Sequence, residues 1–235
     1  SGLIGLDLAI SGKADAPLIN GQAKLSNGRM SNGLSGTEIR SINLQLSAQD
    51  KNVSLSLSAK DNKKGKMSIN GSTVLDGLGF SDLLVSANLK NMHLIERPDI
   101  DGEVSGDLTV SGSNERLDVT GILDITPLSV RLDQIKLSSI PELTIEKNEE
   151  KAMVDNSNIH LNIELVADNR AFLNGLGLDA EMTGAALIQG TSNNPKISGD
   201  FSIDKGQIKL LTKAFKFEQG IVRVEDTSVY LDVRG

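Results

Sequence analysis

Residues 188–203 read IQGTSNNPKISGDFSI and contain two short runs of alternating apolar and polar residues. A loop of Gly, Ser, Asn and Pro lies between the runs. A period of two is typical of a strand with one buried face, and the loop residues are turn formers. This stretch therefore predicts a β-hairpin with a slightly long turn.

The hairpin pattern occurs three times, in residues 5–25, 106–125 and 184–203. In each copy two glycines lie nine positions apart, as Gly190 and Gly199 do in the third, and the apolar residues keep the same phase. The copies start at unequal intervals, so they do not form a solenoid with equivalent rungs. We expect one hairpin module reused inside a continuous sheet, with glycines allowing the bulges and bends that a curved sheet needs.

Alternation with a period of two extends over nearly the whole chain. Residues 53–59 (VSLSLSA) and 159–166 (IHLNIELV) place aliphatic side chains mainly on one face and polar side chains on the other. Residues 80–92 can be placed on a short helix, but they alternate about as well. The sequence predicts an all-β protein in which residues 1–235 form one continuous, curved sheet.

The composition excludes several classes of function. The net charge is −7 and no sustained basic face is present, which argues against nucleic acid as a partner. Lys63, Lys64 and Lys66 come nearest to a basic cluster and are expected in a solvated turn. Cysteine is absent, so disulfides, thiolate catalysis and cysteine-ligated metals are excluded.

No run of about 18 apolar residues predicts a membrane-spanning helix. The first residues, SGLIGLDLAISG, lack an initiating Met and the pattern of a signal peptide. We expect the chain to be a segment of a longer protein, with any membrane anchor outside it.

Motifs for cofactors and metals are weak. Residues 175–180 (GLGLDA) fit a loose dinucleotide fingerprint, but the following residues alternate as a strand where a helix N-terminus is required. Asp99, Asp101 and Glu103 hint at calcium, yet the other ligands of an EF-hand loop are missing, and a solvated turn is expected. We expect no cofactor and no metal.

Catalytic groups are equally sparse. His93 and His160 lie in unrelated predicted strands with no carboxylate or second histidine at ligand spacing, so both are expected on strand surfaces. No GxSxG motif supplies a nucleophile. We expect that the protein is not an enzyme.

The aliphatic residues of the strands are expected on the concave face of the curved sheet. Exposed apolar area costs about 25 cal/mol per Å², so a second sheet, closure into a barrel or β-helix, or an apolar ligand must cover this face. Alternation alone does not distinguish a closed core from an open groove. Aromatic residues make up only 3% of the chain, which favours the groove. The residues assigned to the groove are Ile10, Ile19, Leu25, Leu55, Val110, Val119, Leu123, Ile125, Leu161, Ile163, Ile188, Ile197, Phe201 and Ile203.

The last third of the chain carries a specific order of motifs. Residues 170–211 (RAFLNGLGLDAEMTGAALIQGTSNNPKISGDFSIDKGQIKLL) and 215–233 (FKFEQGIVRVEDTSVYLDV) resemble the C-terminal region of the TamB family, which belongs to the AsmA-like group of bacterial envelope proteins. The earlier two thirds match more loosely, through DGEVSGDLTVSG (101–112) and the strand rhythm.

The resemblance implies an elongated β-taco, a U-shaped sheet with an apolar trough. It implies a location in the periplasm, held by an inner-membrane anchor in an N-terminal part of the protein. It also implies lipid transport, in which phospholipid passes between the inner and outer membranes. An Omp85-type outer-membrane barrel protein is the implied partner, in the assembly of autotransporters and other barrel proteins.

Elementary physical chemistry supports a groove for lipid. Two acyl chains hold about 30 methylenes, and exposing them to water costs on the order of 24 kcal/mol at roughly 0.8 kcal/mol each. A trough of Ile, Leu and Val would let the chains slide while the head group stays in water. Two alternatives remain: an assembly factor that templates client strands by augmentation without conducting lipid, and a stalk whose interior is simply packed.

Overall fold

The computed structural model describes residues 2–134, 158–210, 213–217, 219–226 and 228–234. These residues contain strands and turns but no helix, as the alternation predicts. Residues 80–92 lie within a strand, because alternation prevails there over the weak helical pattern. The strands are β1 (Leu3–Lys13), β2 (Ala16–Ser31), β3 (Glu38–Gln49), β4 (Asn52–Asp61), β5 (Lys66–Asp76), β6 (Gly79–Glu96), β7 (Ile100–Gly112), β8 (Leu117–Asp124), β9 (Leu128–Arg131), β10 (Ile159–Gly175), β11 (Leu178–Thr191), β12 (Asn194–Leu210), β13 (Lys213–Phe217), β14 (Gln219–Glu225) and β15 (Ser228–Arg234).

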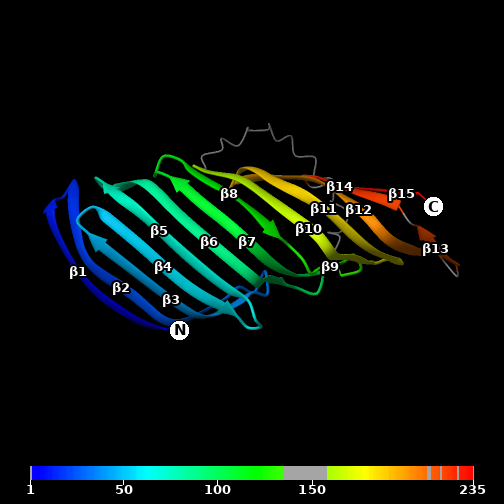
Figure 1. The fold of residues 1–235 in the computed structure, drawn as a ribbon, viewed down its shortest axis with the longest axis horizontal. Coiled ribbons are helices and arrows are strands. Elements are labelled where there is room, and N and C mark those ends of the chain that lie inside the picture. The colour runs from blue at the N-terminus through cyan, green and yellow to red at the C-terminus, as the bar shows by residue number, and fades with distance from the viewer. Residues whose placement is uncertain (1, 135–157, 211–212, 218, 227, 235) are drawn as a thin grey trace, which may run out of the picture.

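All fifteen strands join in one sheet (Figure 1). Strands β1 to β8 pair in sequence order as antiparallel hairpins, and β10, β11, β12, β14 and β15 continue the same pattern. Among the described strands, the antiparallel pattern changes at β10, which pairs in parallel with β8 and β9. Strand β9 pairs with both β7 and β10, so it continues the path of β8 after a break at residues 125–127.

The opening stretch forms the end of the β11–β12 hairpin. Thr191 pairs with Asn194, so the turn holds only two residues and is tighter than expected. The other two copies of the pattern are the β1–β2 and β7–β8 hairpins, and all three share one register. The residues that precede the paired glycines face each other directly: Ile10 with Ile19, Val110 with Val119, and Ile188 with Ile197.

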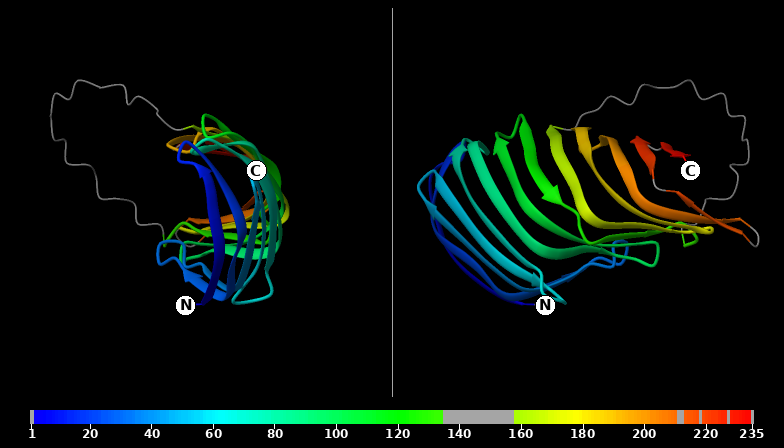
Figure 2. Two further views of the ribbon diagram at one scale, coloured as in Figure 1. Left: turned by 90° about the vertical axis from the view of Figure 1, so that its left-hand side faces the viewer. Right: turned by 45° about the vertical axis from the view of Figure 1, so that its right-hand side comes forward.

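The sheet is strongly curved, and its bends coincide with β-bulges. Figure 2 shows a C-shaped profile with one concave side. The ladder register shifts in β2, β3, β6 and β10, at Asn27, Ser41, Asn91 and Arg170, and each of these residues has a positive φ. A bulge inserts an extra residue and bends its strand. Glycine was expected to allow the bulges and bends, but none of these four residues is glycine, and asparagine, which tolerates the left-handed region, occupies two of the positions.

Glycines in the hairpin modules have two roles: some allow turns, and others allow neighbouring strands to approach each other closely. Gly190 has a φ of 95° where β11 approaches the turn. Gly199 has no positive φ, but a Cβ there would come within 2.5 Å of Ala186 Cα and closer still to the Ala185 carbonyl oxygen. The second glycine of the module therefore lets two backbones approach more closely than any side chain permits.

We expect Gly199→Ala to lower the free energy of unfolding by about 1–3 kcal/mol, because β12 must move away from β11. Gly5→Ala is the matched control, since a Cβ at Gly5 meets nothing within 4 Å. It should change stability by less than about 0.5 kcal/mol. Urea unfolding measures both, and equal effects would contradict the close-approach explanation.

Candidate functional site

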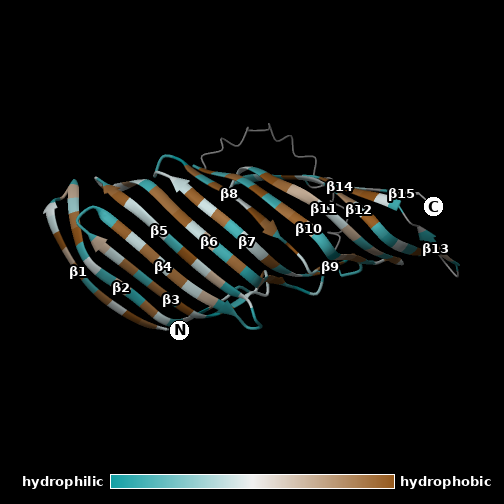
Figure 3. Ribbon diagram, viewed as in Figure 1, coloured by the Kyte–Doolittle hydropathy of each residue, from teal (hydrophilic) through white to brown (hydrophobic). Residues whose placement is uncertain are grey.

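The predicted groove residues lie on one face of the sheet. Residues paired directly across neighbouring strands point to the same side, so the register can be followed from strand to strand. One such row runs through Ala23, Leu46, Leu55, Gly71, Val85, Val110, Val119 and Leu161. The assigned residues in β1, β2, β4, β7, β8, β10, β11 and β12 all have the parity of this row, and Ile125 directly follows β8. Figure 3 shows the alternation of apolar and polar residues along the strands.

The exposure of this aliphatic face is intermediate. All but two of the fourteen assigned side chains are half-buried. The exceptions are Ile10 on the edge strand β1, which is 72% exposed, and Ile203 in β12, which is 3% exposed. Polar residues on the opposite face of β4, such as Ser54, Ser56 and Ser58, are exposed. Such a difference between the faces is expected if the aliphatic side is the concave one, where side chains converge.

Part of the aliphatic face is buried toward the C-terminal end. Leu178, Ala180, Met182, Ile203 and Val222 form a cluster of buried side chains, with Phe201 packed against it. Ile203 and Phe201 therefore contact protein at this end. Over the earlier strands the assigned residues keep part of their surface free.

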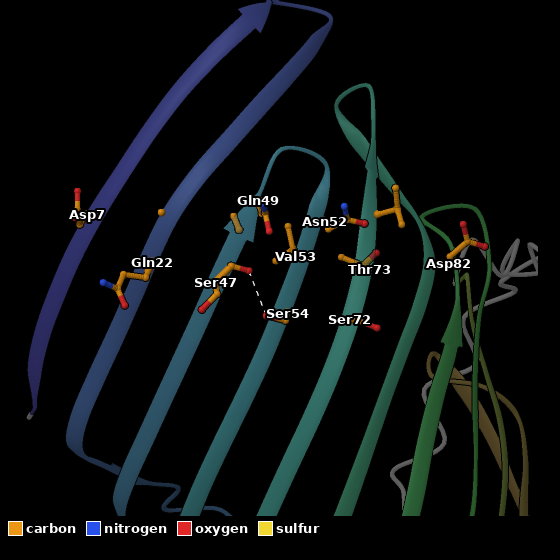
Figure 4. A pocket seen from close by; sticks show the side chains of 13 residues that line it. Asp7, Gln22, Ser47, Gln49, Asn52, Val53, Ser54, Ser72, Thr73 and Asp82 are labelled. Atoms are coloured by element: carbon orange, nitrogen blue, oxygen red, sulfur yellow. Dashed lines mark hydrogen bonds between the residues drawn. The ribbon is translucent and has the colours of Figure 1, made fainter.

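A shallow hollow lies on the opposite, polar face. It has a volume of about 760 Å³ and crosses β1 to β6 (Figure 4). Asp7, Gln22, Ser47, Ser54 and Ser72 face one another in register across five of these strands. Its lining also includes Gly21, Ala48, Val53 and Val74, so the hollow offers both polar and apolar groups.

A buried polar cluster joins β4 to β6, and it was not foreseen from the sequence. His93 is 9% exposed, and its Nδ1 lies 3.1 Å from Asp61 Oδ2 while its Nε2 lies 3.3 Å from Glu103 Oε1. The expectation that His93 is a surface residue without a carboxylate neighbour is wrong. Glu103 is paired with His93 across the β6–β7 hairpin, whereas Asp61 lies 32 residues from His93 and reaches it only through the sheet.

Asp61 holds the β4–β5 turn against β6. Its Oδ1 accepts hydrogen bonds from the backbone N–H groups of Lys63 and Gly65, both at 2.8 Å, and its Oδ2 accepts one from the backbone N–H of His93 at 3.0 Å. Burial by itself would raise the pKa of Asp61, but these hydrogen bonds together outweigh it and hold the pKa below the usual Asp value.

We expect Asp61→Asn to lower the free energy of unfolding by about 1–3 kcal/mol at pH 7, because an amide cannot accept all of these bonds. The lowered pKa gives a contribution that is present above the unfolded-state pKa of about 4 and is lost as the pH falls through the folded-state value. The difference between wild type and variant should therefore shrink in acid. Urea unfolding across this pH range measures it, with the exposed Asp15→Asn as control, and a gap that does not change with pH would contradict the assignment.

The other residues considered from the sequence lie in strands and hairpin turns. Lys63 and Lys64 are exposed in the β4–β5 turn, and Lys66 begins β5. Residues 175–180 form the β10–β11 turn and the start of β11, so no helix follows the glycines. His160 lies in β10, half-buried.

Two of the acidic residues near residue 100 contact basic side chains of the protein. Asp99 accepts a two-pronged hydrogen bond from Arg97, at 2.8 and 2.7 Å, and the carboxyl of Glu103 is turned toward His93. Within the described parts of the chain no group of three or more His, Cys, Asp or Glu side chains is arranged to hold a metal ion. The same parts include no helix that is long and apolar enough to cross a membrane.

Comparison with known proteins gives one match. Residues 54–235, more than half of the chain, match the family model described as the TamB C-terminal domain. Neither the curated proteins nor the solved structures contain a match to the chain.

Proposed function

The chain belongs to the TamB family through its C-terminal domain, and on that premise we propose that its aliphatic face is a groove that conducts phospholipid between the inner and outer membranes. Family membership supports a role in envelope biogenesis and a location in the bacterial envelope. We further propose that the cargo is lipid, that the compartment is the periplasm and that the mechanism is transport.

The observation that carries the proposal is a continuous aliphatic face with only partial cover. The described residues form a single sheet, and its strands contact almost only their hydrogen-bonded neighbours. Between β2 and β11 the assigned side chains are half-buried, which leaves apolar area for another molecule to cover. Acyl chains are a suitable cover, because each methylene removed from water contributes roughly 0.8 kcal/mol.

The aliphatic face and its open side suit the two parts of a phospholipid. The residues assigned to this face are aliphatic apart from Phe201, so an acyl chain would gain similar contacts at each position along it and would not be trapped at one. The charged head group stays in water at the open side, which avoids the large cost of burying a charge. Because the side chains of β11, β12 and β14 meet in the buried cluster, we place the open part of the groove over β2–β8 and β10.

The proposed location, anchor and partner are those that membership of the TamB family suggests. We propose that the segment lies in the periplasm, that a part of the protein outside it supplies the inner-membrane anchor, and that an Omp85-type outer-membrane barrel is its partner in autotransporter assembly. Under this proposal the protein acts by binding and guiding its cargo and is not an enzyme.

We expect Ile163→Asp to remove phospholipid that copurifies with the protein in the absence of detergent. Ile163 is half-buried on the aliphatic face, between Gly121 and Ile188 on the neighbouring strands, so a carboxylate there would meet the acyl chains without a counter-charge. Native mass spectrometry with lipid extraction measures the bound lipid.

The matched control for Ile163→Asp is Asn162→Asp. Asn162 is exposed on the opposite face of the same strand and accepts a hydrogen bond from Gln189, which an aspartate can also do. The control should keep its lipid. Equal lipid content in the two variants, or no phospholipid with the wild type, would contradict the groove.

Strand augmentation is the second candidate, and the exposed edge strand favours it. Within the described chain β1 pairs only with β2, and all of its residues are exposed. If the edge templates client strands, Leu8→Pro should abolish client assembly by removing a backbone donor, and Ile163→Asp should leave assembly intact. Lipid conduction predicts that Ile163→Asp impairs assembly.

A further inference from the structure

Four cationic residues stand in a row across neighbouring strands. Arg40 in β3 is paired with Lys60 in β4, Lys60 with Lys66 in β5, and Lys66 with Lys90 in β6. Like charges directly opposite each other destabilise a sheet. This row is unexpected in a chain whose net charge is −7, and a bound anion would reduce the repulsion along it.

Protein groups offset only part of it. Arg40 is neutralised by Glu38, with hydrogen bonds of 2.8 Å to each carboxylate oxygen. Among the described residues, no carboxylate lies within ion-pair distance of Lys60, Lys66 or Lys90. Three lysines on adjacent strands therefore repel one another across the sheet.

The row ends in a pocket to which the β4–β5 turn adds more positive charge. Lys63 and Lys64 from the turn and Lys66 and Lys90 from the row surround a space of about 650 Å³, together with Asn91, His93 and Glu103. All four lysines are exposed, and the described residues give no ion pair to Lys64, Lys66 or Lys90, so these three ammonium groups remain free to turn toward a ligand. The turn is fixed in place because Asp61 accepts its backbone N–H groups.

The acidic side chains near the pocket contact other protein groups. Glu103 accepts a hydrogen bond of 2.9 Å from Asn91 Nδ2 and lies 3.3 Å from His93 Nε2. Glu96 lies 3.4 Å from Lys63 Nζ. Asp61 is directed inward, with its side chain only 1% exposed. The pocket therefore presents several ammonium groups and few free acceptors.

We propose that this pocket binds a phosphate-type oxyanion, carried by the head group of an anionic lipid or free in solution. Several lysines around one cavity suit phosphate, which lysine binds as a point charge. The bound anion would also relieve the repulsion along the row. Lys66 and Lys90 alternate with Met67 and Leu89 on their strands, so this site lies on the face opposite the groove. The inference does not depend on the groove carrying lipid.

The test compares wild type with the double variant K66Q/K90Q in two assays. Thermal unfolding in increasing inorganic phosphate measures binding of the free oxyanion. Cosedimentation with mixed phosphatidylglycerol and phosphatidylcholine vesicles, against pure phosphatidylcholine vesicles, measures binding of the lipid head group. Removing two lysines near an anionic surface should weaken binding about 30-fold, at about 1 kcal/mol per charge.

The control variant is K13Q/K196Q, which removes two exposed lysines outside the pocket and causes the same change in net charge. It should bind like the wild type. If K66Q/K90Q loses vesicle binding and the control variant does not, the ligand is a lipid head group. If K66Q/K90Q loses phosphate binding and the control variant does not, the ligand is the free anion. Absence of binding in both assays, or equal binding by the two double variants, overturns the site.

Discussion

Cross-strand register is the constraint on which the rest of the structure depends. A strand alternates its side chains between two faces, so a slip of one residue would move every aliphatic side chain to the opposite face. Direct pairs such as Ile10 with Ile19, and Ile188 with Ile197, keep the apolar residues of successive strands on one side. Because the same rule holds through the parallel pairing of β8 with β10, the aliphatic face is continuous across the change of direction.

Curvature gives the two faces different properties. Bulges at Asn27, Ser41, Asn91 and Arg170 bend the strands that contain them. On the aliphatic side most of the assigned side chains are half-buried, and the described residues form no second layer over them, whereas the polar side carries exposed serines, asparagines and lysines. The chain therefore separates an apolar surface suited to hydrocarbon from a polar surface that includes a cationic pocket. The two proposed sites lie on opposite faces and depend on different residues.

Much of the fold was predictable because it is encoded locally. Alternation indicated the strands, and the shared phase of three glycine-marked hairpins placed the groove residues on one face. The contact of His93 with Asp61 was not predictable, because Asp61 lies two strands away and reaches His93 only where β5 has not yet begun. Gly65 permits this approach, since a Cβ there would lie 2.6 Å from the Asn91 carbonyl oxygen. The cationic row depends in the same way on a register that no local pattern reveals.

The central claim is that hydrocarbon, and not protein, covers the aliphatic face over the middle strands. The most direct measurement places a photocrosslinking amino acid at Leu161, on that face, and separately at the neighbouring Asn162, on the polar face, in the protein within its native envelope. Mass spectrometry then identifies what each position captures. The account predicts phospholipid at Leu161 and none at Asn162. Capture of protein alone at Leu161, or equal capture of lipid at both positions, would contradict it.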